Sequence, residues 1–324
     1  MGIRVTVFTS TFNRENTLYR VYDSLVKQTF KDFEWIIVDN GSTDNTKTLV
    51  NSYIEKADFP IIYKYQENLG RHIAINRGVE TARGELFITA DSDDAFEVNS
   101  LEVLVNEWDK IPKEQRSEFK GVTCRCIDGD SGKPLGKEFF KEPLDSNDLE
   151  IVLKYKFDYE MWGILSTEVL RKYPFPEIKG LNFFPETVIW QAIARSYKTR
   201  YINIPLRYYY RDQANALTNL KSFRTKENIY LWVNHINNNF DYFKYDVLSF
   251  VKAFLGLSRD GLLLRMKCKQ IISCCKDIKG KVGCIMFFPM GTVLYLIRRK
   301  RFNKMYPEIK KDDIEQINIY KNIM

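Results

Sequence analysis

Three carboxylates lie within four residues at Asp91-Ser92-Asp93-Asp94. They follow residues 84–90, whose apolar centre predicts a short buried strand. Neighbouring carboxylates repel one another, and a hard cation such as Mg²⁺ or Mn²⁺ would neutralise them while leaving positions open for phosphate oxygens. The alternative is a structural role, because Asp and Ser are favoured at helix N-caps and residues 97–110 are predicted to be helical.

Strands and helices alternate through the segment that leads to these carboxylates. The predicted strands cover residues 3–8, 33–38, 61–65 and 84–90, and helical spacing of apolar residues fills the intervals between them. This order predicts an α/β fold in which a mostly parallel sheet is flanked by helices on both faces. Ligands of such sheets bind beyond the carboxyl ends of the strands. We therefore expect the polar segments 9–14, 39–42 and 91–94 to meet at one rim.

The polar rim lacks a glycine-rich phosphate loop. No G-x-G-x-x-G motif follows the first strand and no G-x-x-x-x-G-K-[ST] motif occurs, so we expect a nucleotide held by side chains and a metal. Asp39 could accept a hydrogen bond from a pyrimidine ring N–H, or could serve as a turn residue before Gly41. Arg71 could bind a diphosphate through its fork of donors, or could be a solvated arginine at a helix start.

Glu186 is a candidate general base. It is predicted in the first turn of a helix, where a carboxylate interacts favourably with the helix dipole without any further role. Its neighbours Phe183, Phe184 and Pro185 are apolar, and such surroundings would raise the pKa of Glu186 and suit it to proton abstraction. The sequence leaves both interpretations open.

The last third of the chain is predicted to be helical. Helical spacing covers residues 224–240, 245–258 and 261–277, and a largely apolar run from 282 to 297 precedes Arg298-Arg299-Lys300-Arg301. This run is shorter than the ~20 apolar residues that span a bilayer. It predicts an interfacial or re-entrant membrane contact through about 282–304, with the basic residues on anionic headgroups, or else a buried amphipathic helix.

Composition narrows the classes of protein. The 324 residues carry a net charge of +7, which suits phosphate-bearing ligands or an anionic surface. The basic run at 298–301 is short, so we expect no nucleic-acid partner. Six cysteines without a C-x-x-C pair, and only two histidines, argue against a zinc site. The N-terminal residues lack the layout of a signal peptide, so we expect a cytoplasmic protein with reduced thiols.

Four segments in this order resemble glycosyltransferase family 2, which has the GT-A (Rossmann-like) fold. They are Val7–Arg14, Ile37–Asp44, Asn68–Gly78 and Asp91–Asp94, and the resemblance covers residues 3 to about 211. The resemblance implies inverting transfer of a sugar from a nucleotide-sugar donor, with a UDP-sugar favoured, usually with Mn²⁺ or Mg²⁺. It also implies a hydroxyl of a glycan or lipid-linked acceptor, in surface polysaccharide synthesis at the inner face of the cell membrane.

The resemblance assigns roles to individual residues. Two positions depart from the usual pattern: Asn40 replaces a common second aspartate, and Pro185-Glu186-Thr187 stands where Glu-Asp is frequent. The implied sites are nucleotide-sugar binding by Thr9, Asp39, Arg71, Asp91 and Ser92, metal binding by Asp93 and Asp91, and general-base catalysis by Glu186.

The expected organisation is a GT-A domain over 1–215 and a helical region over 216–324 that associates with membrane. Within the first, about 1–95 would form the nucleotide-sugar half and about 96–215 the acceptor half. A sugar nucleotidyltransferase is an alternative, although it usually carries a glycine-rich basic loop after the first strand. A non-catalytic nucleotide-sugar-binding protein is the other alternative.

Overall fold

The computed structural model describes residues 2–178, 181–211 and 225–305. The chain divides into two compact units, Met1–Asn219 and Leu220–Met324. The boundary that the sequence predicts at 215/216 lies outside the described residues.

Unit 1 is built on one nine-stranded sheet in the order β3-β2-β1-β4-β8-β6-β9-β5, with β7 paired to β9. The strands are β1 (Val5–Thr11), β2 (Phe33–Asp39), β3 (Ile61–Tyr65), β4 (Leu86–Thr89), β5 (Ala95–Phe96), β6 (Phe119–Asp128), β7 (Leu144–Ser146), β8 (Met161–Ser166) and β9 (Lys198–Tyr209). The first four strands are mutually parallel, and β8 joins them antiparallel to β4. The expected α/β class is confirmed.

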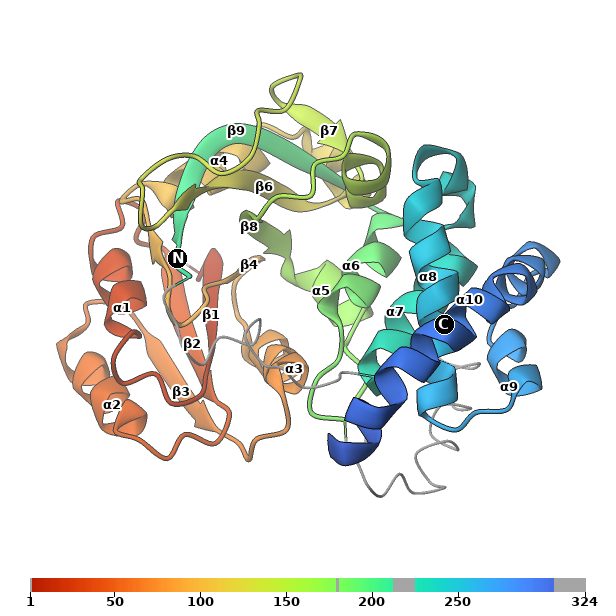
Figure 1. Cartoon of the computed structure of the whole chain (residues 1–324). Helices are drawn as coiled ribbons and strands as arrows, with labels where there is room; N and C mark the ends of the chain where they lie inside the picture. The colour runs from red at the N-terminus through yellow and green to blue at the C-terminus, as the bar shows by residue number, and fades with distance from the viewer. Residues whose placement is uncertain (1, 179–180, 212–224, 306–324) are drawn as a thin grey trace. The chain divides into compact units, whose positions relative to one another are not determined.

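Helices cover both faces of the parallel strands. Figure 1 shows α1 and α2 on one face of β1–β3 and α3 on the opposite face. Every residue of β2 is buried, as a strand covered on both sides requires. The helices of unit 1 are α1 (Tyr19–Val26), α2 (Thr46–Lys56), α3 (Arg71–Thr81), α4 (Ser100–Asp109), α5 (Thr167–Lys172), α6 (Glu186–Ala194), a 3-10 helix (Lys113–Glu118) and a π-helix (Glu150–Lys154).

The sequence pattern on either side of Pro205 predicts two edge strands, at 201–204 and 207–211, and this prediction is wrong. β9 is one continuous strand inside the sheet, paired with β6, β5 and β7. Pro205 has no amide hydrogen, so the local sequence predicts that the strand ends there. The pairing with β6 continues across it through a shift of register at Arg125, so the tertiary partner keeps the strand intact.

Unit 2 is helical. Its helices are α7 (Thr225–Asn238), a 3-10 helix (Phe240–Tyr245), α8 (Val247–Leu263), α9 (Cys268–Ser273) and α10 (Ile278–Met305). They pack around a core that includes Phe250, Phe254 and Leu257. The predicted single helix over 261–277 is wrong, because α8 ends at Leu263 and Arg265 takes a positive φ of 60° before the short α9 begins.

Candidate active site

The carboxyl ends of β1, β2 and β4 bring the predicted rim together. Thr11 ends β1 opposite Asp39, which ends β2, and the acidic segment begins two residues after β4. Arg14 links two of the polar segments, since its Nε donates to Ser92 Oγ at 3.1 Å. The sheet thus places residues from three separate segments at one edge.

Thr9 and Thr11 have different surroundings. The Thr9 hydroxyl is buried and accepts a hydrogen bond from Trp35 Nε1 at 2.9 Å, so it is engaged within the core. The Thr11 hydroxyl is also buried, and it has no hydrogen-bond partner among the described residues. A buried hydroxyl without a partner at a sheet rim is the expected mark of a position that a ligand or water completes. Sequence reasoning missed Thr11, although it stands within the polar segment 9–14.

Asp39 is buried and fully engaged by protein donors. One carboxylate oxygen accepts from the Ser42 amide at 2.8 Å and the other from the Tyr63 hydroxyl at 2.7 Å. Burial, followed by these contacts with Asp39, raises the pKa of Tyr63, so the phenol keeps its proton. The arrangement fixes the turn after β2.

Arg71 joins the acidic segment to the predicted base. Its Nη2 donates to Asp91 Oδ1 at 2.6 Å, and its Nε lies 3.3 Å from Glu186 Oε1. These contacts bring together residues from α3, the segment after β4 and the start of α6. Burial alone would raise the pKa of Asp91, but the Arg71 and Arg207 guanidinium groups hold it below its usual range.

Gly70 allows this approach of α3 to the segment before Glu186. Its φ is +100°, and a Cβ there would lie 2.2 Å from the backbone oxygen of Asn182. The next residue but one, His72, is buried with its ring 6.2 Å from that of Phe184. Burial lowers the pKa of His72 to about 4, so the imidazole is neutral near pH 7 and supports packing behind Glu186.

Arg207 is the main functional residue that sequence reasoning missed. It lies near the C-terminal end of β9, and its side chain is only 4% exposed. Nη2 donates to Asp91 Oδ2 and Nε donates to Asp94 Oδ2, both at 2.6 Å, while Nη1 lies 3.3 Å from Glu160 Oε1. Arg207 therefore holds Asp91 through one carboxylate oxygen while Arg71 holds it through the other. The only sequence signal is an arginine within an aromatic strand.

Asp94 and Asp93 differ sharply in their partners. Burial, opposed by Arg207 and reinforced by Asp91 and Asp93, raises the pKa of Asp94 to about 7. Asp93 is only loosely paired, since its Oδ2 lies 3.8 Å from Arg14 Nη2. Burial and then the charge of Asp91 raise the pKa of Asp93. Asp93 is the member of the segment whose carboxylate remains most available to a further cation.

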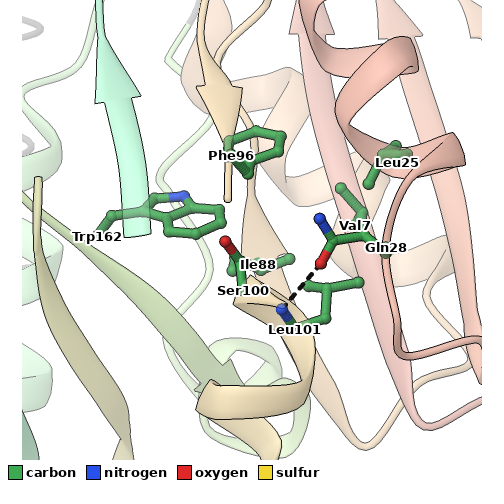
Figure 2. Close-up of a pocket in the computed structure, with 8 residues that line it drawn as sticks. All are labelled: Val7, Leu25, Gln28, Ile88, Phe96, Ser100, Leu101 and Trp162. Carbon is green, nitrogen blue, oxygen red and sulfur yellow. Dashed lines mark hydrogen bonds between the residues drawn. The ribbon is translucent and has the colours of Figure 1, made fainter. Parts of the chain in front are cut away.

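A gap in the core lies apart from this site. Figure 2 shows that it is lined by side chains of β1, α1, β4, β5, α4 and β8, where Gln28 Oε1 accepts a hydrogen bond from Leu101 N. None of the predicted site residues lines it, and its walls leave no space for a water-sized sphere. It is a packing gap and not a ligand site. The lining residues are Val7, Leu25, Gln28, Ile88, Phe96, Ser100, Leu101 and Trp162.

The sequence of the N-terminal part matches the profile of a known family, described as glycosyl transferase family 2, over residues 6–115. An uncharacterized glycosyltransferase of Rickettsia typhi is 25% identical over 95% of this chain and 96% of its own length. A GalNAc(5)-diNAcBac-PP-undecaprenol beta-1,3-glucosyltransferase of Campylobacter jejuni is 29% identical over 64% of each chain.

Solved structures agree on the fold. TarS of S. aureus, residues 1–349 in complex with UDP-GlcNAc, superposes with a TM-score of 0.58 over 94% of this chain and 91% of its own, at 16% identity. At that identity the likeness concerns the fold alone. Residues 6–115 are thus similar in sequence to glycosyl transferase family 2, these relatives are named glycosyltransferases, and the chain shares the fold of solved GT-A-type glycosyltransferases.

Proposed function

We propose that this glycosyltransferase moves a sugar, with inversion, from a UDP-sugar to a hydroxyl of a glycan or lipid-linked acceptor. The observation that carries the proposal is the bridge formed by Arg71, which contacts both Asp91 and Glu186. Arg71, the proposed ligand of the donor diphosphate, is thereby in direct contact with the candidate base Glu186. Direct transfer requires this proximity, because the departing diphosphate and the acceptor hydroxyl share one anomeric carbon.

On the donor side, Arg71 is the proposed diphosphate ligand. Its guanidinium fork matches phosphate oxygens, and it stabilises the charge that develops as the bond from the anomeric carbon to the diphosphate breaks. When phosphate oxygens take over these donors, Glu186 loses its ion pair with Arg71 and becomes available to the acceptor. Asp39 and Ser92 are proposed to shape the nucleotide site through the hydrogen bonds that already fix them.

A divalent cation, Mn²⁺ or Mg²⁺, fits this site through Asp93, with Asp91 as a second ligand. Within the described residues no cluster of three or more His, Cys, Asp or Glu side chains is arranged to hold a metal. Such a cluster is unnecessary, because Mg²⁺ in nucleotide sites usually binds one or two carboxylates together with substrate phosphates. The loose pairing of Asp93 leaves its oxygens free for that role. A bound cation would supply charge stabilisation for the leaving diphosphate.

On the acceptor side, Glu186 is the proposed general base. It takes the proton of the acceptor hydroxyl as the oxygen bonds to the anomeric carbon on the face opposite the diphosphate. The new carbon–oxygen bond forms as the bond to the diphosphate breaks, so the configuration inverts. We propose that residues 96–215 supply the acceptor half and 1–95 the donor half.

The acceptor class is supported by a relative and not by this chain's own geometry. The Campylobacter jejuni relative is named as acting on an undecaprenol-linked glycan. A lipid-linked acceptor would place this enzyme at the inner face of the cell membrane, and synthesis of a surface polysaccharide would be its purpose. Residues 282–304 would then meet the membrane surface.

The test of the function is a donor screen. Purified protein is incubated with a panel of UDP-, GDP- and dTDP-sugars, with Mn²⁺, Mg²⁺ or EDTA, and release of the nucleoside diphosphate is measured. We expect turnover of one UDP-sugar, stimulated by a divalent cation and abolished by EDTA. Release of pyrophosphate from a nucleoside triphosphate and a sugar phosphate would instead identify a nucleotidyltransferase, and binding without turnover in the presence of acceptor would identify a non-catalytic protein.

The metal assignment is tested in the same screen with Asp93→Asn. We expect this variant to lose at least about a hundredfold in cation-stimulated turnover, because it keeps the side-chain volume and removes the charge. Asp58→Asn is the matched control, since Asp58 is an exposed surface carboxylate that forms an ion pair with Lys31. Asp93→Asn with unchanged turnover and unchanged cation dependence would remove Asp93 from the metal site.

The two threonines at β1 are expected to separate binding from stability. Thr11→Val should weaken donor binding by about two- to tenfold, the value of one hydrogen bond, without lowering the free energy of unfolding. Thr9→Val should leave donor binding unchanged and lower the free energy of unfolding by about 1–3 kcal/mol, because it leaves Trp35 Nε1 buried and unpaired. Calorimetric titration with the donor and urea unfolding measure the two effects. Weaker donor binding by Thr9→Val and unchanged donor binding by Thr11→Val would instead assign the nucleotide contact to Thr9.

A further inference from the structure

One face of α10 carries a continuous row of large apolar side chains that are exposed. They recur every three or four residues over 20 positions, from Ile278, which is 77% exposed, to Ile297, which is 70% exposed. This spacing places them on a single side of the helix. Soluble surfaces rarely expose so long an apolar row unless it contacts a partner or a membrane. We call this row the α10 face; it consists of Ile278, Val282, Ile285, Met286, Met290, Val293, Leu296 and Ile297.

The opposite side of α10 is packed against α8. A Cβ at Gly283 would lie 2.4 Å from the Phe254 ring, and one at Gly291 would lie 2.4 Å from Ser258 Cβ, so these glycines allow the helices to approach closely. Phe302 is buried on the same side. Length and composition alone would let α10 cross a membrane. Because one side belongs to the core of unit 2, only the α10 face can meet lipid, and the helix would lie along a surface.

The charges of α10 identify the kind of surface. Residues 278–305 contain no Asp or Glu and seven basic residues, all of which are exposed. At 100° per residue, Lys279, Lys300 and Lys304 project on the same side as the α10 face. Basic side chains at both ends of an apolar row match a bilayer surface with anionic headgroups. They oppose self-association, because a second copy would bring like charges together.

We propose that the α10 face is the membrane-binding surface of this protein and binds anionic lipid with the helix lying in the interface. The apolar row enters the boundary between headgroups and acyl chains, and the basic ends contact phosphate groups. This proposal refines the membrane contact expected from the sequence, since it assigns the lipid-facing residues and excludes a helix that crosses the bilayer. It depends on unit 2 alone, and its test requires no enzymatic activity.

The test is flotation of the full chain with vesicles of phosphatidylcholine, with and without one third phosphatidylglycerol. We expect binding to the anionic vesicles, weakened by high salt. The double variant Met286→Glu/Met290→Glu should reduce the partition coefficient at least about tenfold, because it places charge in the apolar row. Replacing Lys279, Lys300 and Lys304, the basic residues on the side of the α10 face, by Gln should reduce it by about fivefold per charge. The control is Ile54→Glu, a change of an exposed apolar residue on α2 of unit 1.

Three other results of the flotation experiment would contradict the membrane-binding role of the α10 face. Equal binding by Met286→Glu/Met290→Glu and the Ile54→Glu control would overturn the proposal. Association that resists both high salt and alkaline washing would point to a spanning helix and would also overturn it. A wild-type dimer that becomes a monomer in Met286→Glu/Met290→Glu, without vesicle binding by either, would make the α10 face an interface between copies. Circular dichroism of both variants confirms that the helices are intact.

Discussion

Glu186→Gln is expected to lower kcat by about 10²–10⁴-fold, the usual contribution of a general base, with donor affinity largely retained. The amide keeps the shape of the side chain and removes its ability to accept the proton of the acceptor hydroxyl. Donor binding should persist, because the Arg71 guanidinium remains available to the diphosphate when Glu186 loses its charge. The measurements are steady-state turnover of the donor identified in the screen and calorimetric titration of that donor.

Glu160→Gln is the matched control for this experiment. Glu160 is another glutamate at the same charge cluster, with its Oε1 3.3 Å from Arg207 Nη1 and its side chain 41% exposed. We expect this variant to lose less than about tenfold in kcat, because an exposed ion pair contributes little. If instead Glu160→Gln lost turnover and Glu186→Gln retained it, the base would be Glu160.

Arg207→Met is expected to lower the free energy of unfolding by about 3–5 kcal/mol, the usual effect of removing one partner of a buried ion pair. The methionine fills much of the same volume, but Asp94 is left buried without its guanidinium partner. Asp91 loses one of its two cations, so the acidic segment should also lose its orientation. Urea unfolding measures the first effect and donor titration the second.

Arg77→Met provides the control for Arg207→Met. Arg77 forms ion pairs with Glu80 and Glu177 at the surface, and its side chain is 40% exposed. Such pairs contribute about 0–1 kcal/mol. The double variant Arg207→Met/Asp94→Asn should recover part of the lost stability, because it removes the uncompensated carboxylate. Equal effects of Arg207→Met and Arg77→Met would show that Arg207 does not hold the acidic segment.

The order of elements was predictable from the sequence because its causes are local. A buried parallel strand needs a continuous apolar run, and a flanking helix needs apolar residues every three or four positions. In the first 95 residues these patterns predict the alternating strands and helices. The geometry of a parallel sheet then requires its carboxyl ends to share an edge. Arg14 does contact Ser92, which follows from that rule.

Local patterns failed where a distant partner decides the outcome. β9 reads as two short strands because Pro205 interrupts it, and only its pairing with β6 makes it continuous. Thr9 and Thr11 lie on the same strand with the same side-chain chemistry. Trp35, from the next strand of the sheet, engages one hydroxyl and leaves the other without a partner among the described residues. The residues next to Pro205, Thr9 and Thr11 in the sequence predict neither the continuity of β9 nor the different surroundings of the two threonines.

The sequence by itself determined the resemblance to glycosyltransferase family 2, the fold class and the acidic segment at Asp91–Asp94, since these depend on residue types at short spacing. Only the tertiary structure decided what surrounds that segment. Arg207 lies 116 residues from Asp91 and meets it only because β9 crosses the same rim. The α10 face likewise becomes visible only when α8 covers the other side of its helix. Charge pairing and burial depend on distances through space, and spacing along the chain does not fix them.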